Sequence, residues 1–285
     1  MASRVFLVII LSLSFVLQST PAEATTLQHK GLFVSPSRRD VKVLAGNEAR
    51  GSISVYNYYT KALHVDVSVS ALSVIGKEYR YTLTKPNENW ISIIGAKDGI
   101  DLPKNQTKAI TYRVAAPKDA APGDHYFAIV ASTDMSGKGF QQKAQVVSVL
   151  YVQVGGGRII RSAEIKRAET PFLAFSPTIH YAFDVQNTGN VHFDAYFFAR
   201  LENLFGQYAT NGADQVVLAK TTRRITGSIP MPALPGLYEL AYGYKDGDQS
   251  GKKMTIHVLY MPPWFLVTVL LGGLAAVRLF QSRRQ

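Results

Sequence analysis

Apolar and polar side chains alternate with a period of two through most of the middle of this 285-residue chain. The alternation runs over residues 64–71, 179–186 and 191–199, and a longer strand-like segment spans 146–154. No long stretch between residues 25 and 258 shows the 3.6-residue period of an amphipathic helix. The pattern is typical of strands with one buried face, so the middle of the chain is predicted to be all-β.

The β-rich region contains the same order of segments twice. The first copy has a strand ending at Asn57 and a Pro-Gly pair at 122–123, and the second has a strand ending at Asn187 and a Pro-Gly pair at 235–236. Pro-Gly fits a type II turn, because proline sets the first central φ and glycine supplies the positive one. The order of segments predicts a tandem repeat, with chance resemblance as the alternative.

Three consecutive glycines at 155–157 mark the predicted boundary between the copies. Each copy is close to the usual size of an immunoglobulin-like sandwich, about 100 residues. The predicted fold is therefore two tandem immunoglobulin-like antiparallel β-sandwiches, at residues 25–155 and 156–260, followed by a single transmembrane α-helix.

The first 24 residues have the three parts of a secretory signal peptide. Arg4 is the positive region, residues 5–17 are the apolar region, and Ala22-Glu23-Ala24 places small residues where signal peptidase reads them. We expect cleavage before Thr25. An uncleaved anchor helix is the alternative, although the apolar region is short for a bilayer span.

A second apolar segment, residues 261–280, is the predicted transmembrane helix. From Trp264 to Phe280 it offers 17 residues, the lower limit for a span, provided that Arg278 extends to the interface. Trp264 suits the outer interface, and Arg283 and Arg284 in the tail 281–285 suit the cytoplasmic side. We expect a single-pass cell-membrane protein with extracytoplasmic domains and a cytoplasmic C-terminus; a buried or interfacial helix is the alternative.

The chain has 31 Lys+Arg and 20 Asp+Glu, a formal charge of +11. After residue 260 the only charged residues are Arg278, Arg283 and Arg284. Most of the excess positive charge therefore belongs to the predicted exported region. An exported chain meets anionic envelope polymers and lipid headgroups rather than nucleic acid. We predict anionic-surface contacts at local basic clusters, with a solvated β-surface as the alternative; the candidates are Arg38, Arg39, Lys42, Arg158, Arg161, Lys166, Arg167, Arg223 and Arg224.

No catalytic constellation is visible in the sequence. The absence of cysteine excludes disulfides and thiol chemistry, and no nucleophile elbow, phosphate loop or HExxH motif occurs. His64 with Asp66, and His192 with Asp194, lie two residues apart on one strand face and could share a metal. A solvated polar face is the favoured interpretation of both pairs. We therefore expect no enzyme activity, no cofactor and no metal.

Several segments resemble known bacterial domains. Phe33-Val34-Ser35-Pro36 and residues 51–57 are similar to the opening of immunoglobulin-like surface domains and pilus-chaperone-like domains, as are residues 100–103 and 110–123. The whole layout resembles the WxL-interacting cell-surface proteins of bacteria. That resemblance implies binding to cell-wall peptidoglycan and to surface protein partners. Pilus chaperones are soluble, so the hydrophobic C-terminus departs from their pattern.

Two functions follow from these observations. The first is a non-enzymatic, membrane-anchored envelope protein whose domains bind a wall polymer, such as peptidoglycan or an anionic envelope polymer, or another surface protein. The second is an accessory chaperone or assembly factor for exported surface subunits. Binding could use an exposed sheet face or strand addition at a sheet edge.

Overall fold

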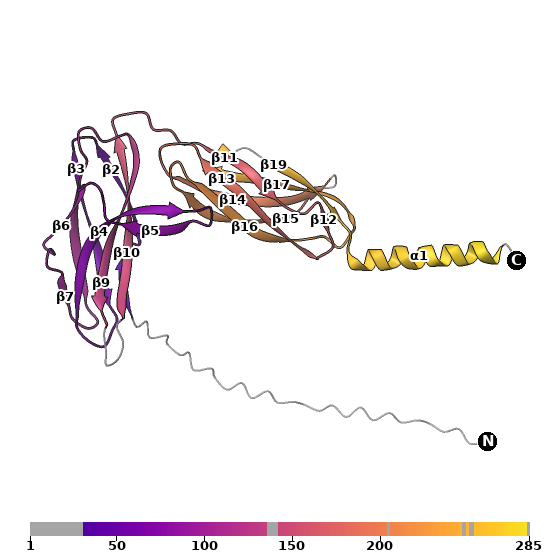
Figure 1. Ribbon diagram of the computed structural model, residues 1–285, viewed down its shortest axis with the longest axis horizontal. Coiled ribbons are helices and arrows are strands. Elements are labelled where there is room, and N and C mark those ends of the chain that lie inside the picture. Colours follow the sequence, from indigo (N-terminus) through magenta and orange to yellow (C-terminus); the bar gives the residue numbers. More distant parts are fainter. Residues whose placement is uncertain (1–30, 136–141, 204–205, 247–248, 251–253, 284–285) are drawn as a thin grey trace, which may run out of the picture.

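The computed structural model contains two β-sandwiches followed by a helix (Figure 1). It describes residues 31–135, 142–203, 206–246, 249–250 and 254–283. The predicted signal peptide, residues 1–24, lies outside the described residues. The described part is mostly strand, and it has the predicted class of fold, two immunoglobulin-like sandwiches with one apolar helix at the C-terminal end.

The first sandwich is formed by two sheets whose apolar faces meet. One sheet has the order β1 (Leu32–Ser35), β3 (Glu48–Asn57), β8 (Thr107–Ala115) and β6 (Ile91–Ile94). The other has the order β2 (Arg38–Leu44), β10 (Lys143–Gly155), β9 (Gly123–Asp134), β4 (Leu63–Ile75) and β5 (Arg80–Thr84), and β7 (Ile100–Leu102) pairs with β4. Alternate residues of each strand, such as Val65, Ile110 and Leu150, fill the core between the sheets.

One edge of this sandwich departs from the predicted antiparallel pairing. β1 pairs with β3 in the first sheet, the chain crosses over at the cis peptide Ser35–Pro36, and β2 then runs parallel to β10 in the second sheet. After this crossover, β2 lies beside β10, the last strand of the sandwich, and the two strands run in the same direction. Periodicity along one strand contains no information on that pairing.

The second sandwich repeats this arrangement. One sheet has the order β11 (Ala163–Glu169), β13 (Thr178–Asn187) and β16 (Thr222–Pro230). The other has the order β12 (Leu173–Ala174), β19 (Met254–Tyr260), β17 (Gly236–Asp246), β14 (Phe193–Asn203) and β15 (Gly206–Val217), and β18 (Gln249–Ser250) pairs with β17. Its core is rich in aromatic rings, including Tyr181, Phe183, Phe197 and Tyr242.

A buried asparagine closes the same corner in both copies. The Asn57 amide donates to the carbonyls of Lys61 and Leu102 at 2.9 Å, and the Asn187 amide donates to those of Val191 and Val217 at 2.8 Å. Each side-chain oxygen accepts the backbone N–H two residues on. In both copies the asparagine ends the strand that precedes a crossing to the other sheet, so its side chain replaces the backbone partners lost at the crossing.

The helix α1 (Pro263–Ser282) follows β19 after only Met261 and Pro262. It starts with proline, whose missing N–H costs nothing in a first turn. None of its residues is buried, and with a mean hydropathy of 1.8 it is long and apolar enough to cross a membrane by length and composition.

Replacement of Asn187 by alanine should lower the free energy of unfolding by about 3 kcal/mol, because two buried carbonyls and one N–H lose their partner. Urea unfolding of the full chain in detergent, followed by circular dichroism, measures the change. The matched control is Asn89→Ala in an exposed loop, which should stay within about 0.5 kcal/mol of the parent. Equal losses in the two variants would contradict the role given to Asn187.

Candidate functional site

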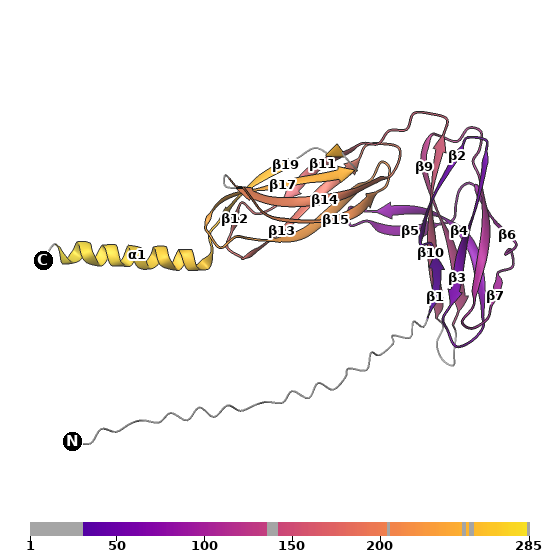
Figure 2. The same ribbon diagram turned by 180° about the vertical axis from the view of Figure 1, so that it is seen from behind.

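The two sandwiches meet at a joint to which each contributes side chains. β4 pairs with β9 only from Asp66 to Ala71, so its last residues and β5 form a hairpin that projects beyond the first sandwich. This hairpin reaches the second sandwich (Figures 1 and 2). Its tip, residues 76–79, contains two positive-φ positions, Gly76 and Tyr79.

Tyr79 is the main contact of the hairpin tip. Its side chain is almost fully buried, and its hydroxyl accepts the Leu218 N–H and shares a hydrogen bond with Thr221 Oγ1 at 2.9 Å. The Arg223 guanidinium lies over the tyrosine ring, 4.5 Å from its centroid. A positive φ is uncommon for an aromatic residue, and these contacts hold the backbone in it.

Lys77, at the same tip, reaches a buried acid of the second sandwich. Its Nζ lies 2.5 Å from Asp184 Oδ2, and the Asp184 side chain is only 4% exposed. The Lys77 carbonyl also accepts the Arg224 N–H at 2.8 Å. Arg224 pairs in turn with Glu169. Arg224 of the same sandwich also lies 3.9 Å from Asp184 Oδ1, and Lys77 adds a closer cation across the joint that helps to offset the burial of this carboxylate.

An apolar cluster lies beneath these contacts. Its buried members are Leu72, Tyr79, Tyr151 and Leu218, and Val74, Leu83, Tyr126, Val149 and Val216 pack against them. Leu218 and Val216 come from the second sandwich and the others from the first. The cluster removes apolar surface of both sandwiches from water, which favours the docked state.

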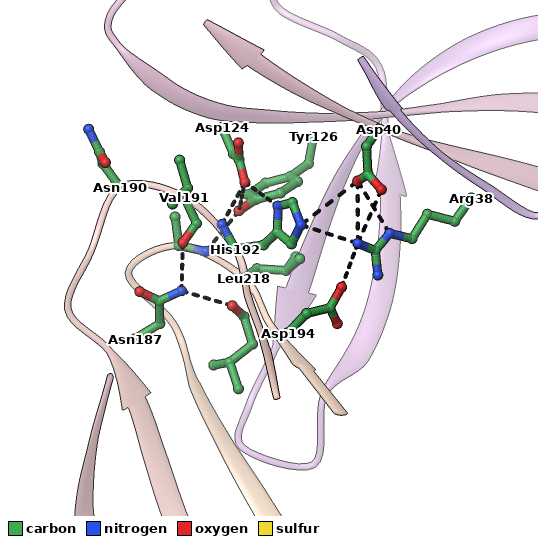
Figure 3. A network of polar contacts seen from close by, with 12 residues as sticks. Arg38, Asp40, Asp124, Tyr126, Asn187, Asn190, Val191, His192, Asp194 and Leu218 are labelled. Carbon is green, nitrogen blue, oxygen red and sulfur yellow. Dashed lines mark hydrogen bonds and ion pairs between the residues drawn. The ribbon is translucent and has the colours of Figure 1, made fainter. Parts of the chain in front are cut away.

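A polar network closes the other side of the joint (Figure 3). Arg38 of β2 reaches Asp194 Oδ2 of β14 at 2.6 Å and Asp40 at 3.3 Å, and its guanidinium lies 4.7 Å from the Tyr151 ring centroid. Burial opposes the charge of Arg38, but its hydrogen bonds to Asp194 and Asp40 outweigh burial and raise its pKa. Arg38 therefore stays charged while it joins the sandwiches.

His192 lies at the centre of this network and links it to Asp124. Its Nδ1 and its backbone N–H both lie 2.5 Å from Asp124 Oδ2, and its Nε2 lies 3.1 Å from an Arg38 nitrogen. Arginine only donates, so Nε2 accepts and Nδ1 carries the proton. In this geometry the imidazole relays a hydrogen bond from Arg38 to Asp124.

Tyrosine hydroxyls complete the joint. Tyr126 accepts the Ala219 N–H at 2.8 Å, as Tyr79 accepts that of Leu218. Burial raises the pKa of Tyr79, Tyr126 and Tyr151 above the ordinary value of tyrosine. All three remain neutral at physiological pH, as hydrogen-bonding groups in an apolar cluster require.

The linker between the sandwiches is tied to the same region by Asn190. Its side chain donates to the carbonyls of Pro122 at 3.1 Å and Arg158 at 2.9 Å and accepts the Ile160 N–H at 2.7 Å. Gly123, with φ +124°, lies against the Asn190 carbonyl, where a Cβ would approach within 2.4 Å. These ties, the hairpin and the network together fix the orientation of the two sandwiches.

An unpaired sheet edge lies on the first sandwich. β2 pairs with β10 only from Val149 onward, and no described strand pairs with residues 143–148 on that side. The Val149 N–H donates to the Ser37 carbonyl at 2.9 Å. Since every second residue of a strand turns its N–H and C=O the same way, those of Val147 and Gln145 point to the open side. This stretch is the free edge of β10.

An aromatic recess lies close to this edge. Phe33, Val34 and Ser35 of β1 line it together with Tyr56 and Tyr58, and it is an open hollow of about 550 Å³. The Tyr58 ring lies edge-on to Phe33, with centroids 5.3 Å apart. β1 lies against β10, and Ser148 Oγ donates to the Pro36 carbonyl at 2.7 Å. The free edge and the recess can therefore contact one extended ligand.

The structure divides the nine predicted basic contacts among several places. Arg38, Arg223 and Arg224 are in the joint, where each has the partners described above. Arg39 and Lys42 of β2 are exposed, as is Arg158 of the linker. The others pair with neighbouring acids: Arg161 with Asp246 at 3.7 Å, Lys166 with Glu164 at 2.7 Å and Arg167 with Glu169 at 3.1 Å.

The two His-Asp pairs have different surroundings. His64 is exposed and bonds Asp101 at 2.8 Å, which is the main cause of its raised pKa. His192 has a side chain only 14% exposed, so the predicted solvated face is wrong for that residue: the first sandwich covers it. Within the described ranges, no group of three His, Asp or Glu side chains is arranged to hold a metal ion.

The predicted membrane-anchor residues lie on or after α1. The Trp264 indole N–H donates to the Ala233 carbonyl at 3.3 Å, which joins the first turn of the helix to the second sandwich. Arg278 is exposed in the last part of α1, and Arg283 caps its end. Arg284 lies outside the described residues.

No protein-family model and no curated protein matches the chain. Among solved structures, a chaperone–tip adhesin complex of CFA/I fimbriae matches with a TM-score of 0.45 and 10% identity, over 81% of this chain and 99% of that chain. The class 5 fimbriae chaperone CfaA gives 0.44 and 9%, over 81% and 100%, and the E. coli chaperone DraB gives 0.39 and 10%, over 80% and 97%. These are pilus-chaperone folds; membership of the WxL-interacting family stays a prediction.

Sequence reasoning missed the joint. It assigned Arg38, Arg223 and Arg224 to an anionic surface and did not single out Tyr79, whose contacts come from a different sandwich. Periodicity predicted this strand only over residues 64–71, and its extension to Ile75 is visible only in the structure.

Replacement of Tyr79 by alanine should loosen the joint, because a buried ring and two hydrogen bonds are lost. Two spin labels, on Glu88→Cys and Asp214→Cys in a chain that has no other cysteine, measure the distance between the sandwiches. We expect a narrow distribution of label-to-label distances for the parent and a broad distribution for Tyr79→Ala. The control Tyr58→Ala removes an exposed ring and should leave the distribution narrow; equal broadening would contradict the role of Tyr79.

Proposed function

We propose that the chain is a non-enzymatic, membrane-anchored assembly factor of the cell envelope that holds an extended segment of another exported protein. The observation that carries the proposal is the free edge of β10, where Gln145 and Val147 turn unpaired backbone groups to the open side. An extended segment can pair with such an edge as an additional strand. Its affinity then comes from main-chain hydrogen bonds that most sequences can form.

The aromatic recess adds side-chain recognition to this edge. Phe33 and Tyr58 are 38% and 45% exposed, so an incoming apolar side chain can contact both rings. In a bound strand every second side chain points to the same side. The ligand is therefore an extended segment with alternating apolar residues, as a β-rich subunit presents before it is assembled.

The apolar helix supports the proposed membrane topology. α1 is unburied in the part of the chain that the structure describes, and its composition suits a bilayer. In the proposed arrangement Trp264 lies at the outer interface and Arg278, Arg283 and Arg284 lie toward the cytoplasm. Both sandwiches are then extracytoplasmic, where exported subunits pass.

Binding to a wall polymer, or to a surface protein as in the WxL-interacting proteins, is the second candidate. The observation that favours it is the aromatic recess, since the stacked Tyr56 and Tyr58 rings could also receive sugar rings. Exposed Arg39, Lys42 and Arg158 would suit an anionic polymer. This candidate makes no use of the free edge of β10, so the two functions can be separated.

Replacement of Gln145 by proline should weaken strand addition, because proline removes the outward N–H while the edge position tolerates it. The probe is a fluorescent synthetic peptide of alternating valine and threonine, and its anisotropy is measured with the full chain in detergent. A loss of affinity of about tenfold or more is expected, since it corresponds to about 1.4 kcal/mol.

The matched control is Gln145→Ala, which removes the side chain and keeps the backbone N–H, and it should bind the peptide like the parent. Unchanged binding of the peptide by Gln145→Pro would contradict strand addition at the edge of β10. Co-sedimentation with isolated peptidoglycan, together with no peptide binding, would favour the second candidate.

A further inference from the structure

We propose that the end of the second sandwich next to α1 is a membrane-contacting foot, formed by Phe172, Leu173, Phe175, Leu234 and Leu237 together with Trp264. These side chains would insert into the outer leaflet of the bilayer that α1 spans. The inference rests on the proposed membrane anchoring and extends it from the helix to the folded domain.

The side chains of the foot are unusually exposed for apolar residues. Phe172, Leu234 and Leu237 are 64%, 66% and 56% exposed, and Phe175 is 43% exposed. Single exposed apolar residues are common on proteins, but a cluster at one end of a domain marks a contact surface. The core of the second sandwich is complete without them.

Strand register places these residues together at the end of the second sandwich from which α1 leaves. β12 runs parallel to β19 and sets Leu173 opposite Leu259, and β17 sets Leu237 opposite the same residue. The Met261 N–H donates to the Ala174 carbonyl at 2.9 Å, so the segment with Phe172 and Phe175 stays beside the chain as it leaves the sheet. Both views show β12 at the end from which α1 departs (Figures 1 and 2).

The first turn of α1 reaches the same level. The Trp264 indole donates to the Ala233 carbonyl, next to Leu234 in the loop between β16 and β17. Only Met261 and Pro262 separate β19 from the helix. A bilayer that contains α1 must therefore begin close to the foot, and Trp264 has the side chain typical of a membrane interface.

A change from apolar to charged residues marks the depth of the contact. Leu237 and Glu239 lie on one face of β17, and Glu239 pairs with His257 at 3.3 Å. Two strand residues span about 7 Å. The ion pair is on the side away from α1, so apolar side chains face the lipid and charges begin at headgroup depth. Continuity with an apolar helix identifies the lipid surface, rather than a protein, as the occupant.

Depth-dependent fluorescence quenching of the full chain in phosphatidylcholine vesicles tests the foot. The chain contains no cysteine, so Leu234→Cys or Phe172→Cys can carry a single environment-sensitive dye. Nitroxide-labelled lipids serve as the quencher. The outside control is Ile94→Cys, 44% exposed on β6 of the first sandwich, and the inside reference is Leu270→Cys in α1.

We expect at least twofold quenching for the Leu234→Cys, Phe172→Cys and Leu270→Cys labels and little for the Ile94→Cys label. Quenching at position 270, with both foot labels unquenched like position 94, would overturn the foot and leave the membrane anchor intact. An unquenched label at position 270 would overturn both the anchor and the foot. The two foot positions are independent, so a local effect of one label does not decide the result.

Discussion

The carboxylate of Asp124 is the interaction on which the arrangement of the two sandwiches depends. Its side chain has no exposed surface, yet one of its oxygens accepts both the backbone N–H and the imidazole Nδ1–H of His192 from the other sandwich. Burial of such a group is costly unless its partners are in place. Docking buries the acid and supplies both donors together, so their hydrogen bonds offset the cost of burial and fix the geometry in which the two sandwiches meet.

The other features act through this joint. The free edge of β10 lies on the first sandwich and α1 leaves the second, so the joint sets the position of the edge relative to α1. The hairpin of β4 and β5 adds a second, separate contact, in which Lys77 neutralises Asp184. Two contacts on different sides of the joint resist bending better than one. A flexible pair of domains would expose the same edge without a defined direction relative to α1.

The two copies show how one pattern can serve different purposes. The same His-x-Asp pattern occurs in both copies, as His64-Val65-Asp66 within β4 and as His192-Phe193-Asp194 at the start of β14. The first pair faces solvent, whereas His192 of the second pair is covered by Arg38 and Asp124 of the neighbouring sandwich. Asp194 stays exposed while it accepts from Arg38. The local sequence is nearly the same, so its meaning depends on what the tertiary structure places opposite. Assignment of His192 to a solvated face was wrong for this reason.

The sequence by itself determined the β class, the repeat and the apolar helix, because these follow from periodicity and composition within short segments. It did not determine the joint, the parallel pairing of β2 with β10, or the free edge that this pairing leaves. Those features join residues far apart in the chain, such as Arg38 with Asp194 and Tyr79 with Leu218. A period of two shows which face of a strand is buried, but the neighbour of that strand is chosen by the packing of the whole sandwich.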